Sequence, residues 1–370
     1  MARRTRGYSL APGESFPKKQ VRRLALYAGV QGWKNTEYVE LLGSAIEALG
    51  KEAVIAGIAP PRLRMLHCVL FLIIHRPTHF FYDPRWGLQK RFGAELEGRA
   101  LGMLLSLIGC VPVSLLNDLP ELIWRRKISL VNKERGLCLV LIDPDIGQIF
   151  APEIRNQVGP VPMAFSARTL QTLKKKWRTY PTTTRSGELS ISFVGSLYEP
   201  RTSILREAQD RLSEQGVKLV VTGRALADPK IEAEEYFRLL GESPQTFTTA
   251  DQAFTSTKQD FPPHLVYRYI EALAAGTLLI APSVPGAERY FTPDVHYLEC
   301  PNIDYLSSHI PTILLDFQKI ETIRKNGRAR VTELVESGFY WNRINDELIA
   351  RGFPRLLAEK WLHGANAWSL

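Results

Sequence analysis

The chain has 370 residues, of which 45% are hydrophobic and 23% are charged, as in an ordinary soluble globular protein. That length suffices for two hydrophobic cores of about 150 residues each, so we expect two domains. The formal net charge is +9, but residues 1–23 hold seven Arg or Lys residues against one Glu. The remainder of the chain is therefore only mildly basic.

The basic tail, residues 1–20, is expected to be a solvated and flexible extension, and binding to anionic lipid or nucleic acid is the alternative. It lacks an apolar core, so no secretory signal is expected. The stretch that most resembles a membrane span is residues 100–116, but it contains Pro112 and changes from a helical to a strand-like pattern near Gly109. This predicts a buried helix followed by a buried strand.

The first half of the chain alternates between strand-like and helix-like segments. Such alternation implies crossover connections and a parallel sheet. The predicted strands are 23–29, 52–58, 78–83, 111–118 and 137–143, and the predicted helices are 37–50, 95–109 and 120–131.

The pattern stops at residues 169–188, which are basic, rich in Pro, Ser and Thr, and without hydrophobic periodicity, as expected of a linker. The alternation then restarts. We therefore expect two α/β domains with parallel sheets, an amino-terminal one over 21–168 and a carboxyl-terminal one over 189–335. In the second domain the predicted elements are a strand at 189–197, a helix at 201–216, a strand at 217–223, and a helix, strand and turn within 267–291.

Ligands of open α/β sheets bind at the carboxyl ends of the strands, preferentially in a cleft between domains. Glycines at such ends let backbone N–H groups approach an anion, and the next helix adds the positive end of its dipole. Basic side chains add full charges for diphosphate oxygens. The strand exits are Gly195-Ser196, Gly223-Arg224 and residues 282–288, and the candidate cations are Arg224, Lys258 and Arg268.

The cysteines and histidines do not indicate a metal site. Cys68, Cys110, Cys138 and Cys300 are far apart and have no metal-ligand spacing, so we expect reduced, buried thiols in a cytoplasmic protein. Pro77 lies between His75 and His79, which disfavours one helical face that presents both. We expect these two histidines to be packed or on the surface.

The segments FVGSLYEPR, LVVTGR and YRYIEALAAGTLLIAPSVPGAERYF resemble the carboxyl-terminal domain of GT-B glycosyltransferases, in particular the bacterial spore-maturation-type group. The resemblance covers roughly residues 190 to 345. It implies two Rossmann-like domains that face a central cleft, with the nucleotide-sugar donor on the second domain. It also implies that the last segment, 336–370, returns toward the first domain, which would hold the acceptor.

The resemblance assigns roles to particular residues. Glu271 would accept hydrogen bonds from the ribose hydroxyls, near Gly223 and Arg224. The turn formed by Pro285, Gly286 and Ala287 would face the diphosphate or the sugar. Glu288 begins a short helix, where a carboxylate is stabilising in itself, so a direct role for it is left open.

One position departs from the family pattern. Many retaining enzymes of this fold have a glutamate eight residues before the ribose-binding one, and this chain has Pro263 there, followed by His264. His264 or Lys258 is a candidate replacement. The departure leaves the stereochemical outcome open and permits an inactive protein.

In the first domain, Gly29, Gly32 and Trp33 follow a predicted strand, and Trp33 is either a stacking platform for a sugar or a half-buried turn residue. Asn117 and Asp118 end another strand, which makes Asp118 a candidate general base. Asp143-Pro144-Asp145 imitates the metal-binding Asp-x-Asp of the other glycosyltransferase fold, but a proline turn explains it.

The sequence thus predicts a metal-independent glycosyltransferase, without a cofactor, in which backbone N–H groups and Arg or Lys stabilise the departing diphosphate. The expected partners are a nucleotide-sugar and a sugar, lipid-linked or protein acceptor, with contact to the inner face of a membrane left open. The alternatives are a nucleotide-sugar-binding protein without catalysis and a DNA-modifying transferase, the latter motivated by the tail and by Lys174–Arg178.

Overall fold

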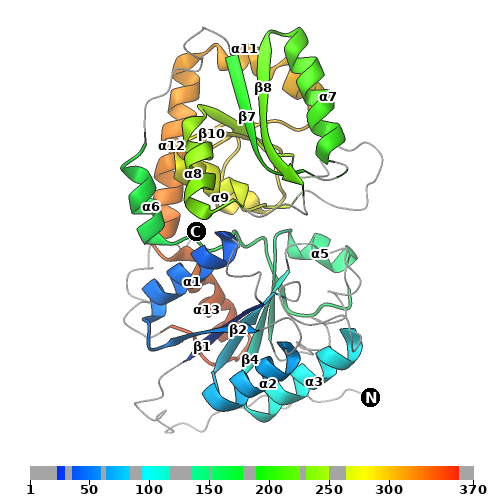
Figure 1. Cartoon of the computed structure of the whole chain (residues 1–370), viewed down its shortest axis with the longest axis vertical. Coiled ribbons are helices and arrows are strands. Elements are labelled where there is room, and N and C mark those ends of the chain that lie inside the picture. Colours follow the sequence, from blue (N-terminus) through cyan, green and yellow to red (C-terminus); the bar gives the residue numbers. More distant parts are fainter. Residues whose placement is uncertain are drawn as a thin grey trace.

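The structure is a computed structural model of two α/β domains, stacked along the long axis of the molecule (Figure 1). The predicted site residues Asp118 and Lys258 lie outside the described residues, as do Asn117, Gly32 and Trp33, and for Arg224 only the backbone is described. The described residues are 23–29, 36–59, 64–83, 94–116, 136–150, 152–177, 189–197, 199, 201–225, 231–249 and 264–357.

The amino-terminal domain contains a six-stranded parallel sheet with the order β2-β1-β3-β4-β5-β6. Its core forms because the strands carry apolar side chains on both faces, as expected of a sheet covered by helices. The strands are β1 Leu24–Gly29, β2 Val54–Ala59, β3 His79–Tyr82, β4 Val111–Leu116, β5 Leu137–Val140 and β6 Gln157–Val158, and the helices are α1 Thr36–Leu49, α2 Arg64–His75, α3 Ala94–Leu107 and α5 Pro144–Phe150.

The carboxyl-terminal domain contains a five-stranded parallel sheet with the order β11-β10-β9-β7-β8. Both sheets are therefore doubly wound, and the predicted fold class is confirmed. The strands are β7 Leu189–Leu197, β8 Val217–Ala225, β9 Gln245–Phe247, β10 Leu278–Ala281 and β11 Leu298–Glu299, and the helices are α7 Arg201–Glu214, α8 Ala233–Glu242, α9 Arg268–Ala275, α10 Ile303–Ser308, α11 Ile310–Leu314, α12 Phe317–Glu336 and α13 Phe339–Ala350.

The segment between the domains is only partly the irregular linker that we predicted. Its first residues belong to helix α6, Ala167–Lys174, which begins at the N-cap Ser166. Two carboxylates of α1 accept hydrogen bonds from this helix end. Glu47 accepts from the backbone N–H groups of Ala167 and Arg168 at 2.8 and 3.0 Å, and Glu40 accepts from Ser166 N at 2.9 Å. Such contacts satisfy N–H groups that a helix leaves unpaired and complement its dipole.

The other end of this connection is anchored in the second domain. The Trp177 indole donates to the Ala274 carbonyl at 2.8 Å, and the Arg328 guanidinium lies 5.4 Å from its ring centre. Gly276, with φ of 85°, ends α9 in the left-handed conformation, and a Cβ there would lie 2.6 Å from the Trp177 ring. The segment between the domains is thus hydrogen-bonded to α1 at its beginning and to α9 at its end.

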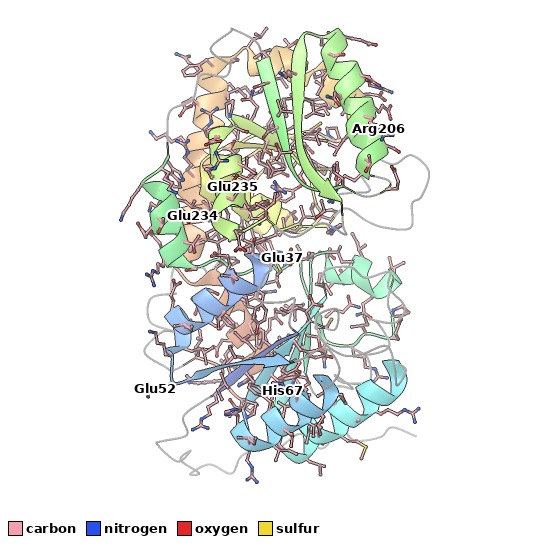
Figure 2. All side chains as sticks on the ribbon, viewed as in Figure 1. Glu37, Glu52, His67, Arg206, Glu234 and Glu235 are labelled. Carbon is pink, nitrogen blue, oxygen red and sulfur yellow. The ribbon has the colours of Figure 1, made fainter. Side chains whose placement is uncertain are left out.

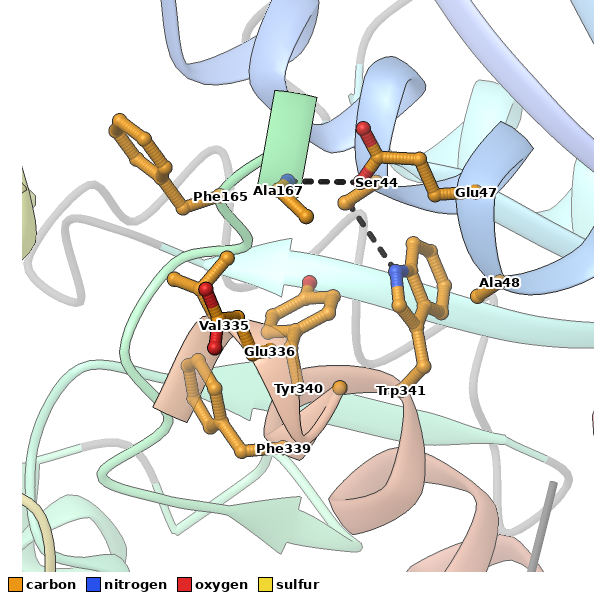
Figure 3. A pocket seen from close by; sticks show the side chains of 11 residues that line it. Ser44, Glu47, Ala48, Phe165, Ala167, Val335, Glu336, Phe339, Tyr340 and Trp341 are labelled. Carbon is orange, nitrogen blue, oxygen red and sulfur yellow. Dashed lines mark hydrogen bonds between the residues drawn. The ribbon is translucent and has the colours of Figure 1, made fainter. Parts of the chain in front are cut away.

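The end of the described chain lies against the first domain. Helix α12 runs beside the second domain and α13 lies within the first (Figure 1). Gly338, with φ of 65°, separates the two helices. Trp341 of α13 packs against Phe81 with ring centres 5.4 Å apart and donates to Ser44 Oγ of α1 at 3.1 Å, beside a cavity of about 90 Å³ (Figure 3).

Residues 100–116 form the end of α3 followed by β4, as predicted. None of the helices within the described ranges is both long and apolar enough to cross a membrane.

We predict that Trp341→Ala lowers the free energy of unfolding by about 3–5 kcal/mol, because the indole is 2% exposed and its loss leaves a cavity where the helix returns to the first domain. Chemical denaturation measures this. Phe317→Ala is the matched control, since that ring is 44% exposed, and it should cost less than about 1 kcal/mol. Equal losses in the two variants would contradict the packing of Trp341 in the core of the first domain.

Candidate functional site

The carboxyl edges of the two sheets face each other across the domain boundary. Leu265 N, just before α9, donates to the Leu141 carbonyl at the exit of β5 at 2.7 Å. Gly286, beyond β10, has φ of 79°, and a Cβ there would lie 2.7 Å from Pro160 Cδ and 3.1 Å from Asp143 Oδ2. Only glycine fits this approach without strain. The strand exits of both domains therefore meet, as ligand binding in such folds requires.

In the second domain, the strand order reverses between β7 and β9, and this is the place where a doubly wound sheet opens for a ligand. The predicted exits Gly195-Ser196 of β7 and Gly223-Arg224 of β8 lie side by side next to this point, because Gly195 pairs with Gly223 and Ser196 with Arg224. A Cβ on Gly223 would collide with the Leu197 side chain. Packing alone is therefore sufficient to explain a glycine at this position.

Arg201, the first residue of α7, bridges the exits of β7 and β9. Its Nη1 donates to the Ser196 carbonyl and its Nε donates to Thr249 Oγ1, both at 3.2 Å. The guanidinium also lies 5.8 Å from the centre of the Phe193 ring. The sequence reading missed both Arg201 and Thr249, although an arginine that opens the helix after a Gly-Ser exit was a usable signal.

Arg268, the first residue of α9, brings a second guanidinium to the exit of β7. It donates to the Val194 carbonyl, and its Nη2 would lie 3.4 Å from a Cβ placed on Gly195. Its Nε is 3.6 Å from Glu271 Oε2, and its guanidinium lies 5.3 Å from the centre of the Tyr236 ring. Among the described residues, the buried Nη1 has no hydrogen-bond partner.

Glu271 lies one turn further along α9 and is 5% exposed. Tyr236 donates to its Oε2 at 2.6 Å. Burial raises the pKa of Glu271 to about 7, and the charge of Arg268 and the Tyr236 hydroxyl act against this rise. Glu37 and Glu40 of α1 also raise this pKa, and Figure 2 shows Glu37 at the end of α1 beside the second domain. The carboxylate thus belongs to a network that spans the boundary.

The remaining predicted residues of this domain lie close to the boundary. His264 is partly buried directly before Leu265. Ala287 is 1% exposed and Glu288 is exposed in the short 3₁₀ helix Ala287–Arg289. The turn with Pro285 and Gly286 packs against the first domain through Gly286. The ligand roles of these residues stay predictions.

The cysteines and Asp143 have structural surroundings. All four cysteines are buried and unpaired with one another, and burial raises the pKa of the Cys300 thiol to about 12. Asp143 Oδ1 accepts from Asp145 N at 2.9 Å, which is the turn that we expected. In the described part of the chain, no group of three or more His, Cys, Asp or Glu side chains is placed to hold a metal ion.

The two histidines and the basic cluster have structural partners. His79 is fully buried and its Nε2 lies 3.0 Å from the Pro354 carbonyl, while His75 packs against Phe71. Lys174 forms an ion pair with Glu336 at 3.0 Å. Lys176 is 3.9 Å from Glu234 of α8, which Figure 2 labels.

We predict that the stability of the wild type falls relative to that of Glu271→Gln as the pH rises. The pKa of Glu271 is raised from 4.5 to about 7, so the protonated carboxyl stabilises the fold fully below about pH 4.5. This contribution is lost as the pH passes through about 7. Between about pH 5 and pH 8, the difference in unfolding free energy should shift by about 1–3 kcal/mol in favour of the glutamine variant.

Chemical denaturation at several pH values measures this shift. Glu214→Gln, on the exposed surface of α7, is the control and should change in parallel with the wild type. A difference between wild type and Glu271→Gln that stays constant with pH would contradict the buried, protonated carboxyl.

Comparison with known proteins agrees with this architecture. Residues 201–337 match the family model described as "Glycosyl transferase-like". No curated protein sequence matches the chain.

Several solved structures share the fold. Sucrose-phosphate synthase from Thermosynechococcus elongatus has a TM-score of 0.59 at 13% identity, over 89% of this chain and 99% of that one. HepE from Anabaena, in complex with UDP and glucose, has a TM-score of 0.56 at 13% identity, over 89% and 98%. A glycosyltransferase from Rickettsia africae ESF-5 has a TM-score of 0.53 at 11% identity, over 89% and 97%.

At these identities the structural matches establish the fold, and the family model establishes the nature of the second domain. The narrower likeness to spore-maturation-type enzymes stays a prediction. Residues 201–337 therefore match the glycosyl transferase-like family, and the chain as a whole has the two-domain GT-B fold of these structures.

Proposed function

We propose that this chain transfers a sugar from a uridine-diphosphate donor, bound at the exits of β7, β8 and β9, to an acceptor on the amino-terminal domain. The observation that carries the proposal is Arg268, a nearly buried guanidinium beside Gly195 that keeps an unpaired Nη1 within the described site. A buried cation without a full set of acceptors points to an anionic ligand. UDP and glucose in the complex of HepE support the choice of donor.

The charges suit a departing diphosphate. In glycosyl transfer, the bond between the anomeric carbon and the diphosphate oxygen breaks, so positive charge grows on the sugar and negative charge on the leaving group. Groups fixed before the reaction stabilise that negative charge best. Arg201 and Arg268 are both held by carbonyl groups of β7, and Arg224 follows at the neighbouring exit.

The ribose would lie against Glu271. We propose that Oε1 accepts from a ribose hydroxyl while Oε2 keeps its hydrogen bond from Tyr236. The Arg268 charge favours the ionised carboxylate, and an ionised carboxylate is the stronger acceptor. Binding of the diphosphate beside Arg268 and binding of the ribose by Glu271 are then coupled through one ion pair.

Acid–base assistance is assigned to Asp118 and His264. His264 directly precedes Leu265, whose backbone N–H donates a hydrogen bond to the Leu141 carbonyl of the first domain, so a change in the placement of the domains would move it. Closure excludes water from an activated donor in many transferases. The proposed location is cytoplasmic, and the proposed acceptor is a sugar, a lipid-linked molecule or a protein.

We predict that Arg224→Ala weakens UDP binding at least about tenfold, because a charge-assisted hydrogen bond contributes roughly 1.5–3 kcal/mol. Isothermal titration calorimetry with UDP measures this. The matched control is Arg206→Ala on the exposed side of α7 (Figure 2), which should bind as the wild type does. Unchanged affinity in Arg224→Ala would remove this residue from the site, and no UDP binding by the wild type would overturn the proposed donor.

We also predict that the transferase needs no divalent metal. Slow hydrolysis of UDP-glucose, followed by UDP release, should change less than about twofold when EDTA is added, since fixed cations replace the metal at the diphosphate. Loss of hydrolysis with EDTA and recovery with Mg²⁺ or Mn²⁺ would contradict metal independence while leaving the donor assignment intact.

A further inference from the structure

The two carboxylate oxygens of Glu271 have different surroundings. Tyr236 donates to Oε2 at 2.6 Å, and Arg268 Nε lies 3.6 Å from the same oxygen. Oε1 has no hydrogen-bond partner among the described residues, and it is not sealed from solvent as Nε and Nη1 of Arg268 are. One oxygen is therefore held by the protein, and the other is available to a ligand.

Tyr236 is fixed by its surroundings as well as by this hydrogen bond. It lies on α8, which packs against α9 (Figure 1). Its ring meets the buried Phe237 ring edge-on with centres 5.6 Å apart, and the Arg268 guanidinium lies 5.3 Å from its ring centre. Aromatic and cation–π contacts of this kind orient a ring. We therefore expect the Tyr236 hydroxyl to keep its place when a nucleotide binds.

A ribose hydroxyl gains little by displacing Tyr236 from Oε2. A hydrogen bond from a hydroxyl to a carboxylate is short and roughly twice as strong as one between neutral groups. A ribose hydroxyl that took this position would leave the Tyr236 hydroxyl without its acceptor, which costs free energy in a partly buried place. The exchange replaces one hydroxyl by another at the same oxygen, so we expect no net gain in affinity.

The neighbouring carboxylates do not offer a substitute for Oε2. Glu40 accepts from Ser166 N and from Thr169 Oγ1, both at 2.9 Å, and Glu37 is not free either. A ribose carries two adjacent hydroxyls, and a carboxylate with both oxygens available can accept from each of them. With Oε1 alone available, only one of the two hydroxyls finds a carboxylate partner.

We propose that Tyr236 is a specificity-determining residue, which occupies one oxygen of Glu271 and so leaves the site able to recognise only one of the two ribose hydroxyls. Nucleoside diphosphates that lack the other hydroxyl then bind about as well as UDP, so the substrate class includes deoxyribonucleotide donors. This rests on the proposed donor site and concerns which donors that site admits. Tyr236 acts through Glu271 and takes no part in the transfer itself.

Isothermal titration calorimetry with UDP, 2′-deoxy-UDP and 3′-deoxy-UDP tests the proposal on the full-length wild type. The titrations are run at about pH 8, above the pKa of Glu271 of about 7, so that the carboxylate is ionised. We expect one deoxy analogue to bind within about threefold of UDP. The other should bind at least about tenfold more weakly, because it lacks the hydroxyl that donates to the ionised Oε1.

Tyr236→Phe keeps the ring beside Arg268 and removes only the hydroxyl. Oε2 is then available to the second ribose hydroxyl, so both deoxy analogues should bind at least about fivefold more weakly than UDP. A purely structural role for Tyr236 would change the affinity for all three ligands by the same factor. The matched control is Tyr305→Phe on α10, whose ring stacks on His309, and it should keep the wild-type selectivity. Circular dichroism checks that both variants fold.

The outcomes separate this proposal from the donor site on which it rests. UDP binding with a loss of tenfold or more for both deoxy analogues in the wild type would overturn the role of Tyr236 and leave the donor site intact, whatever the variant does. Unchanged selectivity in a folded Tyr236→Phe would do the same. Equal binding of all three ligands by the wild type would remove Glu271 from the ribose. A wild type that binds none of them would overturn the donor site and the role of Tyr236 together.

Discussion

The two halves of this molecule can act together only if the carboxyl edges of their sheets face each other, and helix α6 fixes that orientation. Its first turn donates backbone hydrogen bonds to Glu40 and Glu47 of the first domain, and the chain beyond it inserts Trp177 under the end of α9 in the second. The return of α13 through Trp341 closes the connection from the other end. The domains are therefore joined by two crossings, and both pass close to α1.

The same helix α1 links the joint to the donor site. Burial raises the pKa of Glu40 to about 7, against the hydrogen bonds from Ser166 and Thr169, and Glu37 and Glu40 both act on Glu271. A change in the placement of α1 thus alters the charge of the carboxylate that we assign to the ribose. Arg268 lies beside the Glu271 carboxylate and also donates to the Val194 carbonyl at the exit of β7. The proposed donor site and the domain boundary therefore share one electrostatic network.

Much of the architecture follows from local patterns, since alternating apolar strands and helices such as 23–29 and 37–50 predict their own elements. Helix α2 was missed because it carries apolar side chains on its exposed side as well as on its buried side, and β9 was missed because it has only three residues. Within the candidate site, the position of glycines after apolar strand patterns predicted that Gly195 and Gly223 lie near the carboxyl ends of neighbouring strands, which is where they lie. The partners of Glu271 and Arg268 come from α8 and α1, and such pairings depend on tertiary contacts that no spacing in the sequence records. The capping of α6 by Glu47 was hidden for the same reason.

The central claim is that a nucleoside diphosphate rests at the exits of β7 and β8, beside Arg268 and Glu271. A crystal structure of the protein with UDP tests it most directly. The account predicts diphosphate oxygens within hydrogen-bonding distance of the Gly195-Ser196 backbone and of at least one of Arg224 and Arg268, with the ribose at Glu271. UDP seated on the amino-terminal sheet, or on the outer helices with these residues unchanged, would contradict it.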